Sequence, residues 1–211
     1  MSSLHCHHHD RLLFIGDSIT DAGRTNHCPP LGEGFVAMLV KELNQRYSEL
    51  KLQLLNRGIS GNTIEGLKLR WERDVLVEKP DWLFVYIGIN DAHVTLNHSD
   101  TPAQRLKSFS DIYADLISKT KAKLPQVQII LLTPFLLAAE PESEISLLTS
   151  AYVERVCDIG EQANLAIIYL QKLFDSVYKS QPTGHWSLDG VHPTQSGHNL
   201  IADALLKFLA L

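Results

Sequence analysis

The sequence predicts a three-layer α/β/α sandwich, in which helices cover both faces of a five-stranded parallel sheet. Two observations carry this prediction. Short, apolar runs alternate along the chain with longer amphipathic segments, which is the pattern of βαβ units with right-handed crossovers. The short runs lack the polar alternation of a half-exposed strand, so each strand is expected to be buried on both faces, as in a parallel sheet.

The expected elements follow in chain order. The strands are Arg11–Ile15, Leu52–Leu55, Trp82–Ile87, Val127–Leu132 and Ala166–Leu170. The amphipathic helices are Gly34–Tyr47, Thr63–Glu78, Pro102–Lys123, Ser143–Ala163 and Gln195–Leu211. In the last helix, apolar residues recur at three- and four-residue spacing and so form one face, made of Leu200, Ala204, Leu205 and Phe208.

Length and composition indicate one globular domain. The chain has 211 residues, of which 45% are hydrophobic and 20% charged, which excludes disordered, collagen-like and coiled-coil chains. Its longest apolar runs, such as Leu83–Ile89, fall far short of the ~20 residues that a membrane span needs. We therefore expect a single domain over residues 11–211, preceded by a flexible leader over residues 1–10, and no membrane partner.

The net charge and the cysteine content limit which binding partners, disulfides and metal sites the chain can have. The net charge of -5 and the scattered distribution of the 19 basic residues predict no nucleic-acid partner. The three cysteines, Cys6, Cys28 and Cys157, are too few and too far apart for a disulfide framework or a CxxC zinc site. Reduced thiols, and no apolar signal segment before the first strand, favour a cytoplasmic location.

A histidine-rich tract, His5-Cys6-His7-His8-His9, lies within the expected leader. It could capture Zn²⁺ or Ni²⁺, but it precedes the first strand and has no matching ligand pair nearby. A frayed leader or an expression remnant is the preferred interpretation, so no metal site is predicted.

Polar and glycine residues follow several of the expected strands. Ligands of open parallel sheets bind beyond the carboxyl ends of the strands, so these segments are where chemistry is expected. They are residues 16–18 (GDS), 56–61 (NRGISG) and 88–91 (GIND).

Ser18 and a pair of residues near the other end of the chain could together form a nucleophilic centre. A serine hydroxyl needs a base to take its proton, and His192 can serve as that base. Asp189 lies three residues before His192 and would fix its tautomer. Each residue alone has a simpler interpretation, because Ser18 fits a turn or helix cap, and Asp189 with His192 fits a surface loop or half of a metal site.

Acyl transfer also needs hydrogen-bond donors for the developing oxyanion. Candidates are the backbone N–H groups of Ser18 and Gly61 and the side-chain amide of Asn90. The alternative for Asn90 and Asp91 is an Asx turn, and for Asp17 we favour a bracing role in the loop over a catalytic one.

Four segments in this order resemble the signature blocks of the SGNH (GDSL) hydrolase superfamily. They are FIGDSIT at residues 14–20, NRGISGNT at residues 56–63, GIND at residues 88–91 and DGVHP at residues 189–193. The resemblance implies a flavodoxin-like sandwich with Ser18 as nucleophile and Asp189 and His192 completing the triad. It also implies an oxyanion hole made with Gly61 and Asn90, and neither a metal nor an organic cofactor.

Longer stretches look like the bacterial branch of this superfamily that contains intracellular acetylxylan and acetyl-xylooligosaccharide esterases. They include LLFIGDSITDAGR from residue 12, and NRGISGNTIEGLKLRWERDVL from residue 56. In this branch-like segment Arg70, Trp71 and Asp74 could brace the site from behind, as could Asp17 and Asp91 elsewhere. A plain helix with a packed Trp71 and an Asp–Arg pair is at least an equal alternative for the residues of this segment.

The chain departs from this branch near the triad. Leu188 stands where a tryptophan often precedes the catalytic aspartate, and Trp186 lies two residues earlier. Trp186 could offer a ring face to a sugar or cover the loop, and His93 is a candidate second polar contact or a surface histidine.

The sequence therefore predicts a serine esterase that removes small acyl groups, above all acetyl, from hydroxyls of short carbohydrates. Its partner is a small-molecule ester, and it is a candidate homo-oligomer. The alternatives are a short-chain esterase, thioesterase or lysophospholipase, whose acyl channel residues 135–139 (FLLAA) could line. A non-catalytic carbohydrate-binding module is disfavoured, because it has no use for Ser18, Asp189 and His192 together.

Overall fold

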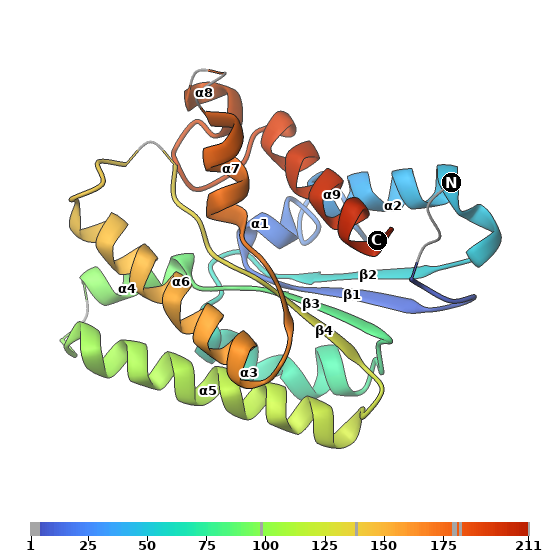
Figure 1. Ribbon diagram of the computed structural model, residues 1–211, viewed down its shortest axis with the longest axis horizontal. Coiled ribbons are helices and arrows are strands. Elements are labelled where there is room, and N and C mark those ends of the chain that lie inside the picture. The colour runs from blue at the N-terminus through green and yellow to red at the C-terminus, as the bar shows by residue number, and fades with distance from the viewer. Residues whose placement is uncertain (1–4, 98, 138, 179–180, 182, 211) are drawn as a thin grey trace.

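The computed structural model describes residues 5–97, 99–137, 139–178, 181 and 183–210. Its strands form one parallel sheet in the order β2-β1-β3-β4-β5, with helices on both faces (Figure 1). The predicted α/β/α sandwich with a five-stranded parallel sheet is confirmed.

The strands lie close to the predicted segments. They are β1 (Arg11–Gly16), β2 (Gln53–Gly58), β3 (Trp82–Tyr86), β4 (Gln128–Leu132) and β5 (Ala166–Ile168). The largest difference is at β2, which continues past the apolar run because Asn56, Arg57 and Gly58 pair in register with the end of β1. The predicted fifth strand is wrong at its end, because Leu170 begins a helix.

The predicted helices are all present with small shifts at their ends. They are α2 (Phe35–Arg46), α3 (Ile64–Trp71) with its π-helical continuation η2 (Glu72–Leu76), α5 (Pro102–Lys123), α6 (Glu144–Gln162) and α9 (Gln195–Leu209). Leu211, the expected end of the last helix, lies outside the described residues. Several short helices were not predicted: α1 (Ser18–Asp21), η1 (Ser48–Leu50), α4 (Ile89–Leu96), α7 (Leu170–Tyr178) and α8 (Thr183–Trp186).

The core lies in two layers, one on each face of the sheet. Alternate residues of a strand point to opposite faces, so Leu12 and Phe14 pack in one layer while Leu13 and Ile15 pack in the other. Helices α2, α7 and α9 cover the first layer, and α3, α5 and α6 cover the second. Both faces are therefore buried, as the continuous apolar runs predict.

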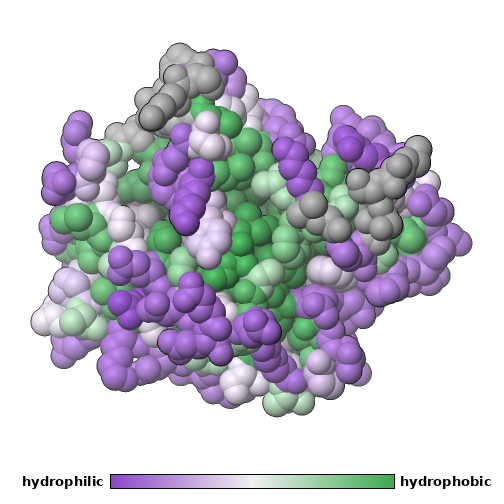
Figure 2. Space-filling view, in the orientation of Figure 1, coloured by the Kyte–Doolittle hydropathy of each residue, from purple (hydrophilic) through white to green (hydrophobic). Residues whose placement is uncertain are grey.

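The edge strand β5 is less covered than the inner strands. Ala166 is exposed and Ile167 and Ile168 are partly buried. This strand faces the viewer in Figure 1, and hydrophobic surface gathers around the same place in Figure 2. Among the described helices, none has both the length and the apolar character that a membrane span requires.

The segment before β1 differs in part from the flexible leader predicted for residues 1–10. Residues 1–4 lie outside the described residues, so that part stays a prediction. From residue 5 onward the chain is docked, because the Cys6 side chain is buried in the core and the His5 N–H donates to the Leu209 carbonyl (2.9 Å). Asp10 accepts a hydrogen bond from the indole N–H of Trp82 (3.0 Å). The sequence does not predict this docking, because the histidines around Cys6 are polar and leave no apolar pattern in the segment.

Candidate active site

Ser18 lies where β1 ends and begins the short helix α1. The preceding Asp17 caps this helix, and its Oδ1 atom accepts from the Ile19 N–H (3.0 Å). Gly16 permits the turn, because a Cβ atom there would collide with the Tyr86 carbonyl oxygen and the Thr20 hydroxyl. The turn presents Ser18 at the carboxyl edge of the sheet, as predicted.

His192 and Asp189 meet Ser18 in one hydrogen-bonded chain. The Ser18 Oγ atom lies 2.9 Å from His192 Nε2, and His192 Nδ1 lies 2.7 Å from Asp189 Oδ2. The three predicted residues thus come together, although Ser18 and His192 are 174 positions apart in the chain. Such an arrangement can move a proton from the serine hydroxyl to the imidazole.

The Asp189 carboxylate also organises its own loop. Its Oδ1 atom accepts from the backbone N–H groups of Val191 (2.9 Å) and His192 (2.7 Å). Partial burial acts to raise the pKa of Asp189, but hydrogen bonds from the His192 ring and from these two N–H groups hold it well below its usual range. Asp189 is therefore ionised at neutral pH and fixes His192 with Nε2 facing the serine.

Two further contacts hold this loop, and the sequence interpretation missed both. Ser187 is buried, and its hydroxyl donates to the His192 carbonyl (2.8 Å). Gly190 has φ +83°, and a Cβ atom at this position would collide with the Leu137 carbonyl oxygen. Leu137 in turn donates its N–H to the Gly190 carbonyl (2.8 Å), which ties the loop to the segment after β4.

The predicted oxyanion donors are available for a ligand. Gly61 has φ +78° and open space where a Cβ atom would stand, so a substrate can approach its N–H closely. Neither Ser18 N–H nor Gly61 N–H is used in a hydrogen bond to another of the described residues. Asn90 donates one amide hydrogen to the Asn62 carbonyl (3.0 Å), which orients the amide and leaves its second hydrogen free.

Arg70 connects the two segments that carry the nucleophile and the oxyanion donors. Its buried guanidinium donates to the Gly16 carbonyl (2.9 Å), the Arg57 carbonyl (2.6 Å) and Asn62 Oδ1 (2.7 Å). It also pairs with Asp74 (2.9 Å). These contacts tie the ends of β1 and β2 to Asn62, which suits a bracing role, and the pair with Asp74 is the one that the plain-helix alternative expects.

Trp71 does not share this position. Its indole is buried in the layer between α3 and α5, and its N–H donates to the Thr120 hydroxyl (2.9 Å). The structure therefore supports the packed-helix alternative for Trp71 over the bracing role, because successive helical residues face different directions.

Asp17 and Asp91 are both buried behind the site. Asp91 Oδ1 accepts from the Ile64 N–H (3.0 Å), which attaches α4 to the start of α3. Burial, opposed by hydrogen bonds and helped by the nearby Asp91 charge, raises the pKa of Asp17 to about 8. Burial likewise raises the pKa of Asp91 to about 7. Both carboxyl groups make contacts suited to bracing, and neither is among the residues that line the cavity beside Ser18.

The two candidate substrate residues occupy different environments. Trp186 is only 9% exposed and packs edge-on against Phe174, with ring centroids 6.3 Å apart. This burial favours the alternative that Trp186 covers the loop, and a sugar-stacking role stays a prediction. His93 is exposed on α4, and its Nδ1 atom lies 2.9 Å from the Ile89 carbonyl oxygen, so its polar contact is made within its own helix.

A cavity of about 350 Å³ opens beside Ser18 and His192. Its other polar lining residues are Glu33, Ser60, Gln195 and His198, of which only Ser60 lies in a segment where the sequence predicts chemistry. They come from three distant parts of the chain, so only the folded structure shows their relation to Ser18.

Two of these lining residues have fixed positions. The Ser60 hydroxyl donates to the buried Asp21 carboxylate (2.7 Å), and hydrogen bonds from Ser60 and Thr25 outweigh burial and lower the pKa of Asp21. His198 Nδ1 accepts from the Phe35 N–H (3.2 Å). Burial, with a smaller contribution from nearby His192, lowers the pKa of His198 to about 4. The His198 ring is thus neutral at neutral pH and carries its proton on Nε2.

The predicted acyl channel is not connected to this cavity by any shared lining residue. Phe135 is fully buried against Phe174, and Ala138 lies outside the described residues. Leu136, Leu137 and Ala139 line a separate cavity of about 540 Å³ next to α6 and α7. The cavity beside Ser18 is lined by a mixture of residues, of which Ser18, Glu33, Ser60, His192, Gln195 and His198 are polar, and such a mixture does not favour a long acyl chain.

Comparison with known proteins agrees with this geometry. The GDSL-like Lipase/Acylhydrolase family model matches residues 14–200. The chain belongs to this family. The match spans every block on which the resemblance rests, so the protein is a carboxylic ester hydrolase of the GDSL type.

The similarity to individual proteins extends over nearly the whole chain. An acetylxylan esterase from Geobacillus stearothermophilus is 38% identical over 206 residues, covering 94% of this chain and 93% of that one. The crystal structure of Axe2, an acetylxylan esterase from Geobacillus stearothermophilus, has 35% identity and a TM-score of 0.85, covering 97% and 96% of the two chains. LAE5, an alpha/beta hydrolase enzyme from the metagenome of Lake Arreo, Spain, has 29% identity and a TM-score of 0.84, with 97% of each chain covered.

Structures of Axe2 catalytic mutants are also similar to this chain, each with a TM-score of 0.86 and 34% identity. A serine, an aspartate or a histidine is replaced by alanine in them. In Axe2 two residues separate the aspartate from the histidine, as two residues separate Asp189 from His192 here.

Proposed function

We propose that this GDSL hydrolase removes acetyl groups from the hydroxyls of short carbohydrates such as xylo-oligosaccharides, with Ser18 as nucleophile. The observation that carries the proposal is the hydrogen-bonded chain from Ser18 Oγ through His192 (2.9 Å) to Asp189 (2.7 Å). A serine in this arrangement is activated for attack on an ester carbonyl.

The reaction begins with proton transfer. Ser18 Oγ attacks the acetyl carbonyl carbon while His192 Nε2 takes the hydroxyl proton, and Asp189 stabilises the imidazolium that forms. The tetrahedral intermediate then collapses, the bond to the sugar oxygen breaks, and His192 returns the proton to that oxygen. The products of this half are the free sugar hydroxyl and an acetyl ester on Ser18.

Water completes the cycle. His192 takes a proton from a water molecule that attacks the acetyl–Ser18 carbonyl. The bond to Ser18 Oγ then breaks as the proton returns to it, and acetic acid leaves and releases its own proton to solvent to give acetate. In both halves the negative oxygen accepts hydrogen bonds from the N–H groups of Ser18 and Gly61 and from the free amide hydrogen of Asn90. These are the donors that the described residues leave unused.

The cavity supports a polar leaving group. The residues that line the space beside the triad include an acid, a hydroxyl residue, a primary amide and an imidazole: Glu33, Ser60, Gln195 and His198. Sugar hydroxyls can both donate to and accept from such groups, whereas a long acyl chain gains little there. The acetylxylan esterase relatives support the same substrate class.

A paired substrate assay tests the proposal. We would compare acetate release from acetylated xylobiose with hydrolysis of nitrophenyl acetate and nitrophenyl octanoate by the same enzyme. Fast sugar deacetylation with little octanoate turnover is expected. Good octanoate turnover with slow sugar deacetylation would retain Ser18 as nucleophile but move the protein to the lipid and general esterases. A Ser18→Ala sample run in parallel measures any background activity.

Three further expectations belong to this proposal. Catalysis is expected to need no metal or organic cofactor, so a chelator should leave turnover unchanged. A cytoplasmic location and self-association both stay predictions. Size-exclusion chromatography with light scattering measures the oligomeric state directly.

A further inference from the structure

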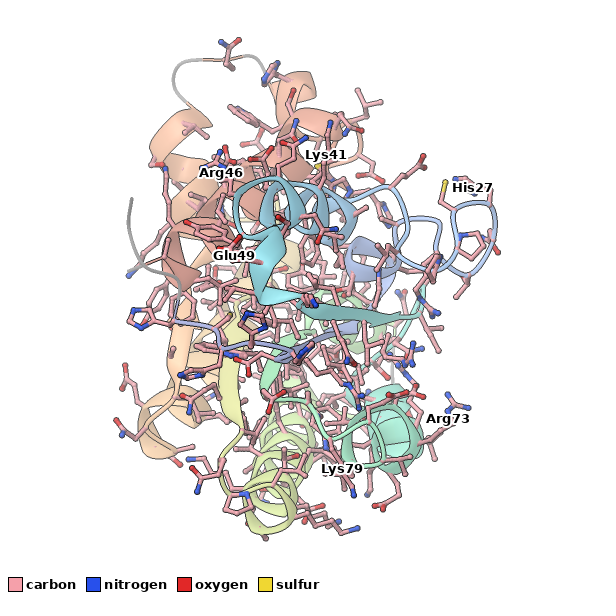
Figure 3. The ribbon with its side chains drawn as sticks, turned by 90° about the vertical axis from the view of Figure 1, so that its right-hand side faces the viewer. His27, Lys41, Arg46, Glu49, Arg73 and Lys79 are labelled. Carbon is pink, nitrogen blue, oxygen red and sulfur yellow. The ribbon has the colours of Figure 1, made fainter. Side chains whose placement is uncertain are left out.

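A cluster of three potential metal ligands lies on the loop that follows α1, outside the serine hydrolase chemistry. His27, Cys28 and Glu33 each offer one ligand atom, and these atoms all lie within 4.8 Å of one another. His27 Nε2 lies 3.0 Å from Glu33 Oε1, and the Cys28 thiol lies 3.8 Å from Glu33 Oε2. Figure 3 labels His27 on this loop, which projects from the body of the molecule.

These separations suit a tetrahedral ion. Zinc lies about 2.3 Å from a thiolate and about 2.0–2.1 Å from an imidazole nitrogen or carboxylate oxygen, so its ligand atoms are roughly 3.3–3.6 Å apart. The observed separations of 3.0 Å from His27 to Glu33 Oε1 and 3.8 Å from Cys28 to Glu33 Oε2 lie within a few tenths of an ångström of this range. The ligand atoms of His27 and Cys28 lie within 4.8 Å of each other, so this third pair closes further when an ion binds.

The charges and donor types also fit. A thiolate and a carboxylate together balance the two positive charges of the ion, and the imidazole adds a neutral nitrogen. A set of one sulfur, one nitrogen and one oxygen ligand suits zinc, whereas magnesium and calcium prefer oxygen ligands alone.

The backbone holds the ligands ready. The N–H groups of both His27 (3.0 Å) and Cys28 (2.9 Å) donate to the Gly23 carbonyl, and the Glu33 N–H donates to the Ala22 carbonyl (2.8 Å). The His27 ring lies directly over Gly23, since a Cβ atom added there would stand 2.8 Å from the ring atoms Cε1 and Nε2. The loop thus fixes the backbone of every ligand and the plane of one ring before any ion binds.

We propose that His27, Cys28 and Glu33 bind one Zn²⁺ ion, with solvent as the fourth ligand, at a site separate from the catalytic triad. The thiol loses its proton to solvent as the Zn–S bond forms, and no electrons are exchanged. The site lies at the rim of the catalytic cavity, because Gly23 and Glu33 also line that cavity.

Cobalt(II) provides a direct probe, because a cobalt–thiolate bond gives a charge-transfer absorption band. The histidine tract must first be prevented from binding metal, so all samples carry His5→Ala, His7→Ala, His8→Ala and His9→Ala. The reduced, metal-free protein is titrated with Co²⁺, and Zn²⁺ is then added. We expect a thiolate band that saturates at one equivalent and disappears as Zn²⁺ displaces Co²⁺.

Two cysteine variants show which thiolate binds the Co²⁺ ion. Cys28→Ser should abolish the band, whereas Cys157→Ser, on α6, should retain it. Cys6 needs no variant, because burial raises the pKa of its thiol to about 12. A band that survives Cys28→Ser, or the absence of a band in the parent protein, would overturn the proposal.

Affinity gives a second measurement. In competition with a chromophoric chelator, His27→Ala and Cys28→Ser should each weaken Zn²⁺ binding at least about 100-fold, since loss of an outer partner of a metal ligand already costs 10–100-fold. Equal Zn²⁺ affinity in the parent and both variants would contradict the site. Unfolding temperatures without metal show whether each variant folds, and they do not depend on the proposed esterase activity.

Discussion

The two halves of the catalytic centre are held in place by different means. The half that carries the nucleophile and the oxyanion donors rests on buried polar groups that join three strand ends. Arg70 links the ends of β1 and β2, and Asp91 attaches the start of α4, which follows β3, to α3. The half that carries the base is one surface loop, in which the Asp189 and His192 side chains are each 54% exposed.

This difference separates two kinds of mutational effect. Removing a buried, multiply bonded group leaves several partners unsatisfied, so stability and activity should fall together. An exposed residue that is held by its own loop contributes little to folding, so its loss should reduce activity alone. Mutations in the buried half should therefore inactivate the enzyme by destabilising its fold. Mutations in the exposed loop should inactivate it by removing a catalytic group while the fold stays intact.

The largest expected effect is on the proton-transfer pair that joins the two halves. Ser18→Ala should lower kcat by up to about 10⁶, and His192→Ala should be nearly as severe, because the nucleophile and its base act as one unit. Turnover of nitrophenyl acetate by the purified variants measures both losses.

The double variant sharpens this test. Ser18→Ala combined with His192→Ala should be no slower than either single variant, because the first change already removes the shared step. Losses that multiply would show that Ser18 and His192 act independently and would contradict the proposed mechanism.

The second-largest effect is expected in the exposed loop that carries Asp189 and His192. Asp189→Asn should lower kcat by about 10⁴, because an amide no longer holds His192 in the tautomer that accepts a proton from Ser18. The free energy of unfolding should change by less than about 1 kcal/mol, since the exposed ion pair is screened by solvent. Urea denaturation and nitrophenyl acetate kinetics on the same sample measure both quantities. A loss of stability as large as that of a buried pair would remove the distinction between the halves.

Arg70→Met tests the buried half. We expect a loss of about 3–5 kcal/mol in the free energy of unfolding, because the Gly16 and Arg57 carbonyls and Asn62 lose a buried charged donor. The kcat should fall as well, since Asn62 also orients Asn90. Urea denaturation and steady-state kinetics give the two values.

The neighbouring arginine supplies a matched control. Arg73 also pairs with Asp74 (2.6 Å), but its side chain is exposed, and among the described residues it makes side-chain hydrogen bonds to Asp74 alone. Arg73→Met should therefore change stability by less than about 1 kcal/mol and leave kcat unaltered. Similar losses from Arg70→Met and Arg73→Met would mean that the pairing with Asp74, and not the link between strand ends, is what matters.

Much of the fold follows from local patterns. The inner strands β3 and β4 are buried on both faces, so a continuous apolar run identifies them. The end of β2 is polar, and its place in the sheet depends on distant partners. The Asn56 amide, for example, donates to the carbonyls of Thr20 and Leu31 (2.7 Å each). Helix α1 has only four residues, too few for any periodicity to show.

The site divides in a similar way. Ser18, Asp189 and His192 belong to short motifs at strand ends and in one loop, so their meeting could be predicted. Glu33 and His198 line the same cavity only because the loop before α2 and the first turn of α9 fold against each other. Residues that no local motif joins can be assigned to one cavity only from the folded chain.

A smaller effect concerns the ionisation of the buried half. The pKa of Asp17 is raised to about 8, against about 3.9 in the unfolded chain, so the native state binds a proton that the unfolded state releases. The stabilisation that the native state gains by holding this proton on Asp17 is therefore fully present below about pH 4, and it is lost as the pH rises towards about 8.

Asp17→Asn should remove that loss while it keeps the oxygen that accepts from the Ile19 N–H. The difference in unfolding free energy, variant minus wild type, should rise by at least about 1 kcal/mol when the pH is raised from about 5 to about 8. Urea denaturation at the two pH values measures the difference. A wild type and variant with parallel pH profiles would show that Asp17 ionises as easily when folded as when unfolded.

The smallest effect is expected at Trp186, which lies beside the exposed base loop but is itself buried. Its indole nitrogen has no hydrogen-bond partner among the described residues, so Trp186→Phe gives up no hydrogen bond and keeps the aromatic contact with Phe174. The variant should lose less than about 1.5 kcal/mol of stability and keep its kcat/KM on acetylated xylobiose. If Trp186 instead stacked on the sugar, KM for acetylated xylobiose would rise while nitrophenyl acetate turnover stayed constant.

Leu188→Ala is the control, because this side chain is 87% exposed and its loss should leave stability within about 0.5 kcal/mol of the wild type. A selective rise in KM in Trp186→Phe alone would extend the substrate site beyond the polar cavity and make the indole part of it.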